Sequence, residues 1–476
     1  MNTELFGKGV LILGVIIFVV SLIMYPVSII PGSSINPLEA TSFQTMQQLT
    51  TASENISFPQ EYYVETSSLN LATQSTDKPI YVLTYKHGSR YEKSYTFKET
   101  LTKQEYVSFA KNEDIIGIWD VPTILFQKPN LMETTTYQYG TMSDALQSTN
   151  TVTAVNQGDN GDNTIIVVID AFPSESTFYD YIPNQWKNRI IHYPTDTMNH
   201  AHGIMTAGIA GYVSPNAKLY LISSNQDPIS NFEKIKQLKN QYPNHNIICS
   251  NSYVFTGTCY YDSNHPVNRK ILETANENII VLFGAGNWAK ENEHTPQWTL
   301  DVGYDSRNYM FERDSQIGYP AVFDEVISVA GCNAYGNKIV SYSSLGRGVD
   351  NNDEPDVSAP THHYYENSPY NQLTIGTSAS TPFMAGIIAN VLTNKDADTN
   401  RMVGTIHQTS LDKGKSGFDE EFGYGIADTI KIINIYDSWI PIPKNESNIF
   451  YILSISLIVI GGILYKKNDI VNVIGG

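Results

Sequence analysis

Residues 376–386 have the sequence GTSASTPFMAG, which places a serine between small residues at the expected start of a helix. The N-terminus of a helix has backbone N–H groups without intrahelical partners and the positive end of the helix dipole. Pro382 fits the first turn of such a helix, where its missing N–H costs little. The stretch is therefore typical either of an ordinary helix cap or of a presented nucleophile, Ser378, beside N–H groups that can stabilise an oxyanion.

Two upstream segments contain a candidate base and a candidate group to orient it. Residues 164–170, TIIVVID, form a continuous apolar, β-branched run, which predicts a parallel strand buried on both faces and ending in Asp170. Residues 202–211, HGIMTAGIAG, predict a closely packed helix that begins at His202. Each of these residues by itself is most often structural. Their order, Asp170 then His202 then Ser378 on alternating strands and helices, is the order found in subtilisin.

This order and the motifs around it resemble the subtilisin-like serine peptidases, the subtilases, over residues 130–437. The family's serine motif, G-T-S-x-[AS]-x-P-x-x-A-G, is matched by residues 376–386, and its histidine motif, H-G-x-x-x-A-G, by residues 202–208. Shorter matches are AGN at 285–287, YPA at 319–321, SYSSLG at 341–346 and DVSAP at 356–360. The resemblance implies an α/β fold, in which helices flank both faces of a parallel sheet, and a serine endopeptidase activity.

The resemblance also implies a role for each matched residue. Ser378 would be the nucleophile that forms the acyl-enzyme, His202 its general base, and Asp170 the group that holds the imidazole in the required tautomer. Asn287 would donate a hydrogen bond to the oxyanion. The substrate cleft would be lined by two short segments, which comprise Ser252, Tyr253, Val254, Gly284, Ala285 and Gly286.

Two positions depart from the family pattern. Phe172 stands where the family usually has glycine, so the turn after Asp170 cannot rely on a positive φ angle. Val254 replaces another glycine, which predicts altered main-chain pairing with an extended substrate. The neighbouring sedolisin family uses glutamate as the base and aspartate at the oxyanion position, whereas this chain has His202 and Asn287. The subtilases are therefore favoured.

The first third of the chain predicts a small α+β unit. Residues 79–86 and 115–122 have the pattern of strands, and residues 103–110 indicate a helix. We interpret residues 40–128 as the prodomain that subtilases commonly carry, which assists folding and then acts as an intramolecular inhibitor until it is cleaved. An unrelated accessory domain is the alternative. Residues 133–163 would then contain the processing site.

Two apolar segments predict membrane spans. Residues 10–30 are long for a signal-peptide core and have no clear small-residue cleavage site, which favours an uncleaved anchor over a signal peptide. Residues 449–465 precede Lys466 and Lys467, which favours a second span over a buried core helix and places the C-terminus inside. The catalytic domain would then lie on the extracytoplasmic side, with residues 438–448 as a linker and residues 1–9 and 466–476 in the cytoplasm.

The net charge of the chain limits the classes of molecule that it is expected to bind. The formal net charge of −18 disfavours nucleic acid, which requires a basic surface, so we expect protein or peptide substrates. The prediction is a membrane-anchored serine endopeptidase that acts on extracytoplasmic proteins. The alternative is a catalytically silent surface protein that keeps the fold for peptide binding or attachment. Phe172 and Val254 favour this alternative, whereas the four filled catalytic positions favour the enzyme.

No required cofactor or metal is expected. No Cys or His spacing indicates zinc, and His200 is expected to be a surface neighbour rather than a ligand. Structural calcium is common in the family, but no site can be assigned from the acidic loop that contains Asp353, Glu354 and Asp356. Three cysteines are too few for a disulfide scaffold; a bridge between Cys249 and Cys259 is one option.

Overall fold

The computed structural model describes residues 58–87, 90–122, 124–126, 139–198, 200–225, 227–255, 264–287, 289, 317–348, 352–369 and 372–439. All of these belong to one compact unit of the chain, Leu38–Trp439. The predicted spans at 10–30 and 449–465 lie outside these ranges, as do the predicted domain boundaries at residues 40, 128 and 130. Within the described ranges, no helix is long and apolar enough to cross a membrane.

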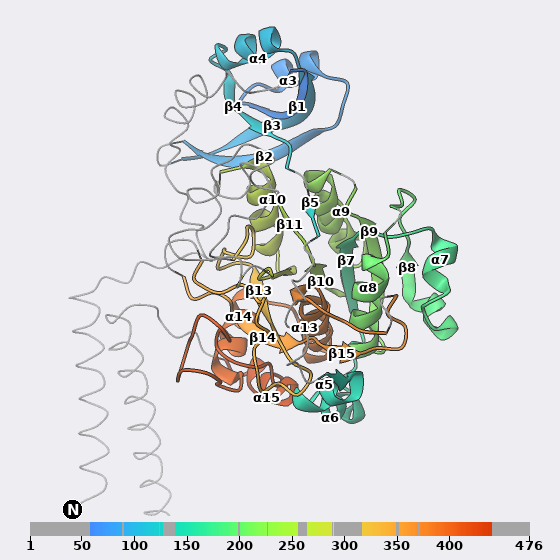
Figure 1. Cartoon of the computed structure of the whole chain (residues 1–476). Coiled ribbons are helices and arrows are strands. Elements are labelled where there is room, and N and C mark those ends of the chain that lie inside the picture. Colours follow the sequence, from blue (N-terminus) through green and yellow to red (C-terminus); the bar gives the residue numbers. More distant parts are fainter. Residues whose placement is uncertain are drawn as a thin grey trace, which may run out of the picture. The chain divides into compact units, whose positions relative to one another are not determined.

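A seven-stranded sheet forms the centre of the larger domain, and all of its strands are parallel (Figure 1). Its order is β14 (Val357–Pro360), β13 (Ile327–Cys332), β12 (Ile280–Gly284), β10 (Asn246–Asn251), β7 (Thr164–Asp170), β9 (Lys218–Ser223) and β8 (Ile190–His192). The predicted strand at 164–170 is β7, at the bounds expected. The predicted parallel α/β fold is confirmed.

Helices cover both faces of this sheet, as the continuous apolar pattern of β7 requires. Ile166 and Val168 face a core shared with α8 (His202–Val213) and α13 (Thr377–Val391). The alternate residues of β7 face a second core, shared with α9 (Pro228–Gln241) and α10 (Pro266–Ala275). Every residue of β7 and of α13 is buried.

The order of the strands determines where the site lies. β9 and β10 flank β7 on opposite sides, although both follow it in sequence, so the chain reverses its direction of progress across the sheet at this point. In open parallel sheets, ligands bind outside the carboxyl ends of the strands at such a switch point. Asp170 ends β7, and Ser252 directly follows β10.

Smaller elements complete the larger domain. The helices are α5 (Met142–Ser148), α6 (Thr151–Gln157), α7 (Glu175–Tyr179), the 3-10 helix Asn184–Arg189, α14 (Thr399–Thr409) and α15 (Thr429–Tyr436). Two pairs of short strands join distant segments. β5 (Ile124–Leu125) pairs antiparallel with β11 (Val254–Phe255), and β6 (Gly140–Thr141) pairs parallel with β15 (His363–Tyr364).

Residues 60–120 form a separate βαββαβ unit, which we call the N-terminal unit. It consists of β1 (Gln60–Thr66), α3 (Leu69–Ser75), β2 (Ile80–His87), β3 (Arg90–Leu101), α4 (Lys103–Ala110) and β4 (Ile115–Asp120). Its antiparallel sheet has the order β2-β3-β1-β4. β2, α4 and β4 lie at the predicted positions, whereas β1, α3 and β3 were not predicted.

The N-terminal unit contacts α10 and the start of α9 through polar groups. Arg269 on α10 donates to the Glu65 carboxylate at 2.7 Å and to the Thr84 carbonyl oxygen at 3.0 Å. The Tyr63 hydroxyl donates to Asp227, the N-cap of α9, at 2.6 Å. Tyr63 is also fully buried in the core shared with α9 and α10. The N-terminal unit is therefore held on the larger domain by hydrogen bonds, one buried ion pair and apolar packing.

Candidate active site

Asp170 and His202 form a buried pair at the carboxyl edge of the sheet. Asp170 is the last residue of β7 and His202 the first of α8, and their side chains meet with Nδ1 at 2.8 Å from Oδ1 and 3.0 Å from Oδ2. Asp170 is fully buried and His202 is 9% exposed. Nδ1–H therefore donates to the carboxylate, which leaves Nε2 as the basic nitrogen of the neutral ring.

Two further donors hold the Asp170 carboxylate in place. The Thr206 hydroxyl donates to Oδ2 at 2.9 Å, and the Ala171 backbone N–H donates to Oδ1 at 2.6 Å. A buried carboxylate requires such partners, because burial without them is costly. Thr206 was not predicted, although it lies four residues after His202 and therefore on the same face of α8.

The turn after Asp170 is built around Phe172 rather than around a glycine. Phe172 is fully buried and has no positive φ angle, and its ring contacts those of Phe178 and Tyr193. A Cβ on Gly203 would lie 2.6 Å from this ring. The phenylalanine thus fills the space that the glycine beside His202 leaves open, and the departure from the family pattern does not disturb the Asp170–His202 pair.

Ser378 is the second residue of α13, as the sequence predicted, whereas Pro382 is the sixth residue and lies beyond the first turn expected for it. Gly376 caps this helix with φ 87°, an angle that a side chain strongly disfavours. The Ser378 hydroxyl donates to the Ser252 carbonyl oxygen at 3.3 Å, and the Ser252 hydroxyl donates to the Ser378 carbonyl oxygen at 3.0 Å. Among the described contacts, the His202 ring is hydrogen-bonded to Asp170 and not to Ser378. A rotation of the serine side chain is therefore needed before Nε2 can accept its proton.

Asn287 follows β12 and is tied to the same helix start. Its side-chain oxygen accepts from the Thr377 backbone N–H at 3.0 Å and from the Thr377 hydroxyl at 3.2 Å. A backbone N–H can only donate, so the group that faces Thr377 is the amide oxygen, and the amide nitrogen is the donor of this side chain. The structure thus brings Asn287 beside the residue that precedes Ser378.

Gly284, Ala285 and Gly286, which the sequence assigned to the cleft, connect β12 to Asn287. The Ala285 N–H donates to the Val329 carbonyl oxygen at 3.0 Å, and the Gly286 carbonyl oxygen accepts from the Ser344 N–H at 2.9 Å. These backbone groups are used within the domain. These hydrogen bonds position Asn287. Val254 differs, because its strand β11 pairs with β5, which follows the N-terminal unit.

A tyrosine and a histidine that sequence reasoning missed hold the cap of α13. The Gly376 N–H donates to the Tyr342 hydroxyl at 2.7 Å, and this hydroxyl lies 2.8 Å from His362 Nε2. Burial lowers the pKa of His362 to about 4, so its ring is neutral at pH 7. Tyr139 stacks on the same ring, with centroids 5.2 Å apart. Tyr342 occupies the phenylalanine position of the family's F-S-S-x-G motif, which is the signal that could have found it.

Strand β5, from the segment that follows the N-terminal unit, lies along the predicted cleft. Leu125 pairs with Val254 and Ile124 with Phe255. Val254 therefore pairs with an extended segment despite the missing glycine. Phe126 follows directly, and its ring centroid lies 5.0 Å from that of His202. His200 is exposed, as expected of a surface neighbour, and its Nδ1 accepts from the His202 N–H at 3.2 Å.

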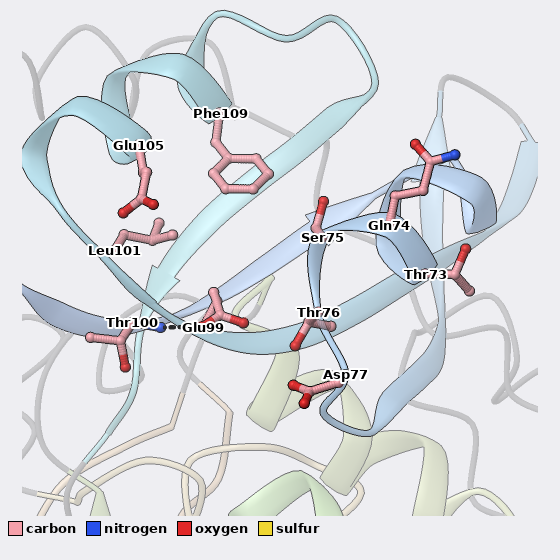
Figure 2. Close-up of a pocket in the computed structure, with 10 residues that line it drawn as sticks. All are labelled: Thr73, Gln74, Ser75, Thr76, Asp77, Glu99, Thr100, Leu101, Glu105 and Phe109. Carbon is pink, nitrogen blue, oxygen red and sulfur yellow. Dashed lines mark hydrogen bonds between the residues drawn. The ribbon is translucent and has the colours of Figure 1, made fainter.

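A pocket of about 700 Å³ lies in the N-terminal unit, away from the Asp170–His202 pair (Figure 2). Its carboxylates include those of Glu99 and Glu105, and each accepts a backbone N–H of its own segment. Glu105 completes the capping box of α4. These side chains therefore serve local structure, and the Asp170–His202 pair and Ser378 lie in the other domain.

The described residues contain no group of three or more His, Cys, Asp and Glu side chains arranged to hold a metal ion. In the acidic loop, Asp353 pairs with Arg347 at 2.6 Å, and Asp356 accepts from the Ser328 N–H at 2.8 Å. Cys249 carries a free thiol enclosed in β10, where burial raises its pKa to about 12. Cys259, its suggested partner, lies outside the described residues.

Comparison with known proteins agrees with this geometry. The model of the subtilase family, Peptidase_S8, matches residues 98–425. A solved structure of a serine-to-alanine mutant of the epidermin leader peptide processing serine protease (EpiP) from Staphylococcus aureus superposes with a TM-score of 0.52 and 17% identity, over 79% of this chain and 99% of that one. Fervidolysin from Fervidobacterium pennivorans, a keratinolytic enzyme related to subtilisin, gives 0.51 and 16%, over 81% of this chain and 62% of that one.

These two structures share the fold at low identity, and the family match covers well over half of the sequence. The matched range includes the ends of β7, β10 and β12 and the starts of α8 and α13, where the buried pair, the serine and the asparagine meet. The chain therefore belongs to the subtilase family and is a serine endopeptidase.

Proposed function

We propose that this subtilase is made as a membrane-anchored precursor and that, once its N-terminal unit is cleaved off, it hydrolyses extracytoplasmic proteins or peptides through an acyl-enzyme on Ser378. The single observation that carries the precursor part is the pairing of β5 with β11, because it places a segment of the chain itself along the cleft strand. The catalytic part rests on the buried Asp170–His202 pair.

The acyl-transfer steps follow from the side chains at the site. Ser378 Oγ turns from the Ser252 carbonyl oxygen to His202 Nε2, which takes its proton as Oγ attacks the peptide carbonyl carbon. Asp170 stabilises the imidazolium that forms. The carbonyl oxygen becomes an oxyanion and receives hydrogen bonds from the Asn287 amide and the Ser378 N–H. His202 then protonates the leaving amine, and water hydrolyses the ester by the same route in reverse.

The inhibitor role of the N-terminal unit is supported by two sets of contacts. Phe126 lies against His202, so a substrate could not place a side chain there at the same time. The unit itself is held by Arg269 and by Asp227 on the helices of the catalytic domain. An accessory domain with no inhibitory role would not require residues 124–126 to enter the cleft.

The extracytoplasmic location rests on the sequence alone. Residues 10–30 and 449–465 are the two apolar segments, and Lys466 and Lys467 follow the second. Structural calcium is also only proposed, and its basis is the resemblance to the subtilase family. Neither affects the chemistry proposed for Ser378.

The test uses the full-length chain and two serine variants on the same helix. Wild type, Ser378→Ala and Ser380→Ala are incubated with casein and with a serine-directed phosphonate, and all products are measured by mass spectrometry. Ser380 is fully buried two residues along α13, so Ser380→Ala is the matched control.

We expect wild type and Ser380→Ala to be labelled at Ser378, to cut casein and to release an N-terminal fragment that ends between residues 128 and 160. Ser378→Ala should stay intact and unlabelled. If wild type is also intact and unlabelled over a wide pH range, the proposal fails and a peptide-binding role without catalysis replaces it. If casein is cut with the N-terminal unit still attached, the peptidase stands and the inhibitor role is wrong.

A further inference from the structure

Phe126 lies among three aromatic side chains of the catalytic domain. Its ring stacks on that of His200, with centroids 5.6 Å apart and planes 24° apart. It contacts His202 at 5.0 Å and meets Tyr253 edge-on at 6.2 Å, with planes 72° apart. An aliphatic side chain at this place could fill the same volume, but it would not gain the stacked and edge-on geometries, which add to the energy of burial.

His200 contributes to this arrangement in a second way. Its Nδ1 accepts from the backbone N–H of His202 at 3.2 Å, so its ring is oriented by the first residue of α8. This hydrogen bond lies within the catalytic domain, so it restricts the ring independently of Phe126. Orientation in advance reduces the entropy that is lost when a peptide side chain stacks on it.

The strand register shows which residue of a bound peptide this contact concerns. β5 and β11 pair antiparallel with Leu125 opposite Val254, so Phe126 stands opposite Tyr253. The residue next to Tyr253 is Ser252, whose carbonyl oxygen lies 3.3 Å from Ser378 Oγ. In this register, the peptide residue opposite Ser252 has its carbonyl group beside the nucleophile, and the aromatic residue is the one immediately before it.

Side-chain alternation agrees with this placement. Successive residues of an extended segment point to opposite faces, so Ile124 and Phe126 share a face. Both pack against the core that contains Tyr253, Val254 and Phe255. The same face of a bound peptide would therefore be apolar two residues before the aromatic one.

We propose that His200 is a specificity-determining residue and that, with His202 and Tyr253, it forms a subsite for an aromatic side chain at the second residue before the cleaved bond. The inference rests on the proposed function, and it adds the class of peptide that the enzyme prefers. Its basis is the stack of His200 on Phe126, which the chain itself places in the subsite.

The test compares kcat/KM of the full-length enzyme for peptides that differ at one residue only. Phe, Leu or Ala is placed in turn at each of the four residues before the cleaved bond. We expect Phe to exceed Leu by about three- to tenfold at the second residue and at no other. The difference should appear in KM, because the stack forms in the ground state and persists in the transition state.

Two variants of His200 separate its two contacts. His200→Asn keeps a side-chain acceptor for the His202 N–H and removes the ring, so the Phe-to-Leu ratio should fall to about one. His200→Phe keeps a ring and removes the acceptor that orients it, so the ratio should fall only in part and stay above one. His192 stacks on Tyr220 in β9, with centroids 4.4 Å apart, and His192→Ala is the matched control that should leave the ratio unchanged.

The outcomes distinguish this inference from the proposed function. Cleavage of all peptides without aromatic preference, or a preference that His200→Asn retains, would overturn the inference and leave the peptidase intact. Loss of the preference in His192→Ala as well would also overturn it, since the effect would not be local. If no peptide is cleaved and Ser378 is not labelled, the proposed function fails, and the inference fails with it.

Discussion

The two parts of the described chain reach stability in different ways. In the catalytic domain, all 15 residues of α13 and all 7 of β7 are buried. In the N-terminal unit, α4 has no buried residue and α3 has only Ala72. The core of that unit contains six buried apolar residues, which are Tyr62, Val64, Ala72, Phe97, Leu101 and Ile115. A unit with so small a core is marginally stable by itself.

The two regions therefore differ in what stabilises them. The catalytic domain folds around its own cores, and its site is built from buried strand ends and helix starts. The N-terminal unit is held by Arg269 and Asp227 of the catalytic domain and by the buried ring of Tyr63 in the second core. Polar contacts of this kind can separate in water with little penalty, because water replaces the lost partners. The buried ring of Tyr63 is the part of this contact whose exposure to water would cost free energy.

The largest expected effect comes from a small change in the catalytic domain. Asp170→Asn keeps the shape of the side chain but removes the charge that holds His202 in its tautomer, so kcat should fall by about 10⁴-fold without unfolding. Steady-state kinetics with a peptide substrate and circular dichroism measure the two quantities. Glu61→Gln in the N-terminal unit is the control, because it removes an exposed charge paired with Lys98, and kcat should not change. An equal loss of kcat in both variants would contradict the assignment of catalysis to the catalytic domain alone.

A second prediction compares the two cores directly. Phe97 and Phe232 are both fully buried, one in each region. Phe97→Ala and Phe232→Ala should each cost about 3–5 kcal/mol, which exceeds what the small unit can lose. In Phe97→Ala, amide hydrogen exchange should show loss of protection over β1 to β4 alone, with α8 and α13 still protected. Global unfolding of that variant would show that the two regions fold as one cooperative unit.

The third prediction concerns pH and the interface. Burial, with the nearby positive charge of Arg269, lowers the pKa of His265 from 6.5 to about 3. Its Nδ1 accepts from the Val267 N–H, and its Nε2 lies 3.0 Å from the Asp120 carbonyl oxygen of the N-terminal unit. Below pH 6.5, His265 is protonated in the unfolded chain but stays neutral in the folded one. The free energy of unfolding therefore falls as the pH falls towards 3.

This contribution changes by at most about 1.4 kcal/mol per pH unit. Denaturant titrations of wild type and His265→Asn at pH 7, 5.5 and 4 measure it, since asparagine keeps a capping acceptor without titrating. Wild type should lose more stability than the variant at each step. Parallel curves for the two proteins would mean that His265 takes no part in acid sensitivity.

The smallest effect is expected for the cap of α13. Tyr342→Phe removes the acceptor of the Gly376 N–H and should cost about 1 kcal/mol, or about fivefold in kcat, with KM unchanged. Tyr436 makes the same two kinds of bond, accepting from the Asp398 N–H and donating to the Asp396 carbonyl oxygen, but in α15. Tyr436→Phe should therefore lose similar stability and keep its kcat. A fall in kcat for both variants would mean that the effect is one of stability alone.

The same contrast explains what could be predicted from the sequence. β7 and the starts of α8 and α13 were predictable because burial on both faces and helix-start signals leave strong local patterns. β3 was not, because it is a half-exposed hairpin strand rich in charged residues, and its buried residues do not alternate regularly with exposed ones. The contacts of Phe126 with His202 and of Tyr342 with His362 join segments far apart in the chain, and no local pattern encodes such meetings.

The order of the strands has a consequence for biosynthesis. β7 lies between β9 and β10, so it has no partner in the sheet until later residues leave the ribosome. β2 and β3, by contrast, are neighbours in both sequence and space, and such local contacts form early. Residues 124–126 are synthesised before β11, and Ser378 emerges after both. Under the proposed inhibitor role, the segment that covers the cleft strand is therefore translated before the nucleophile.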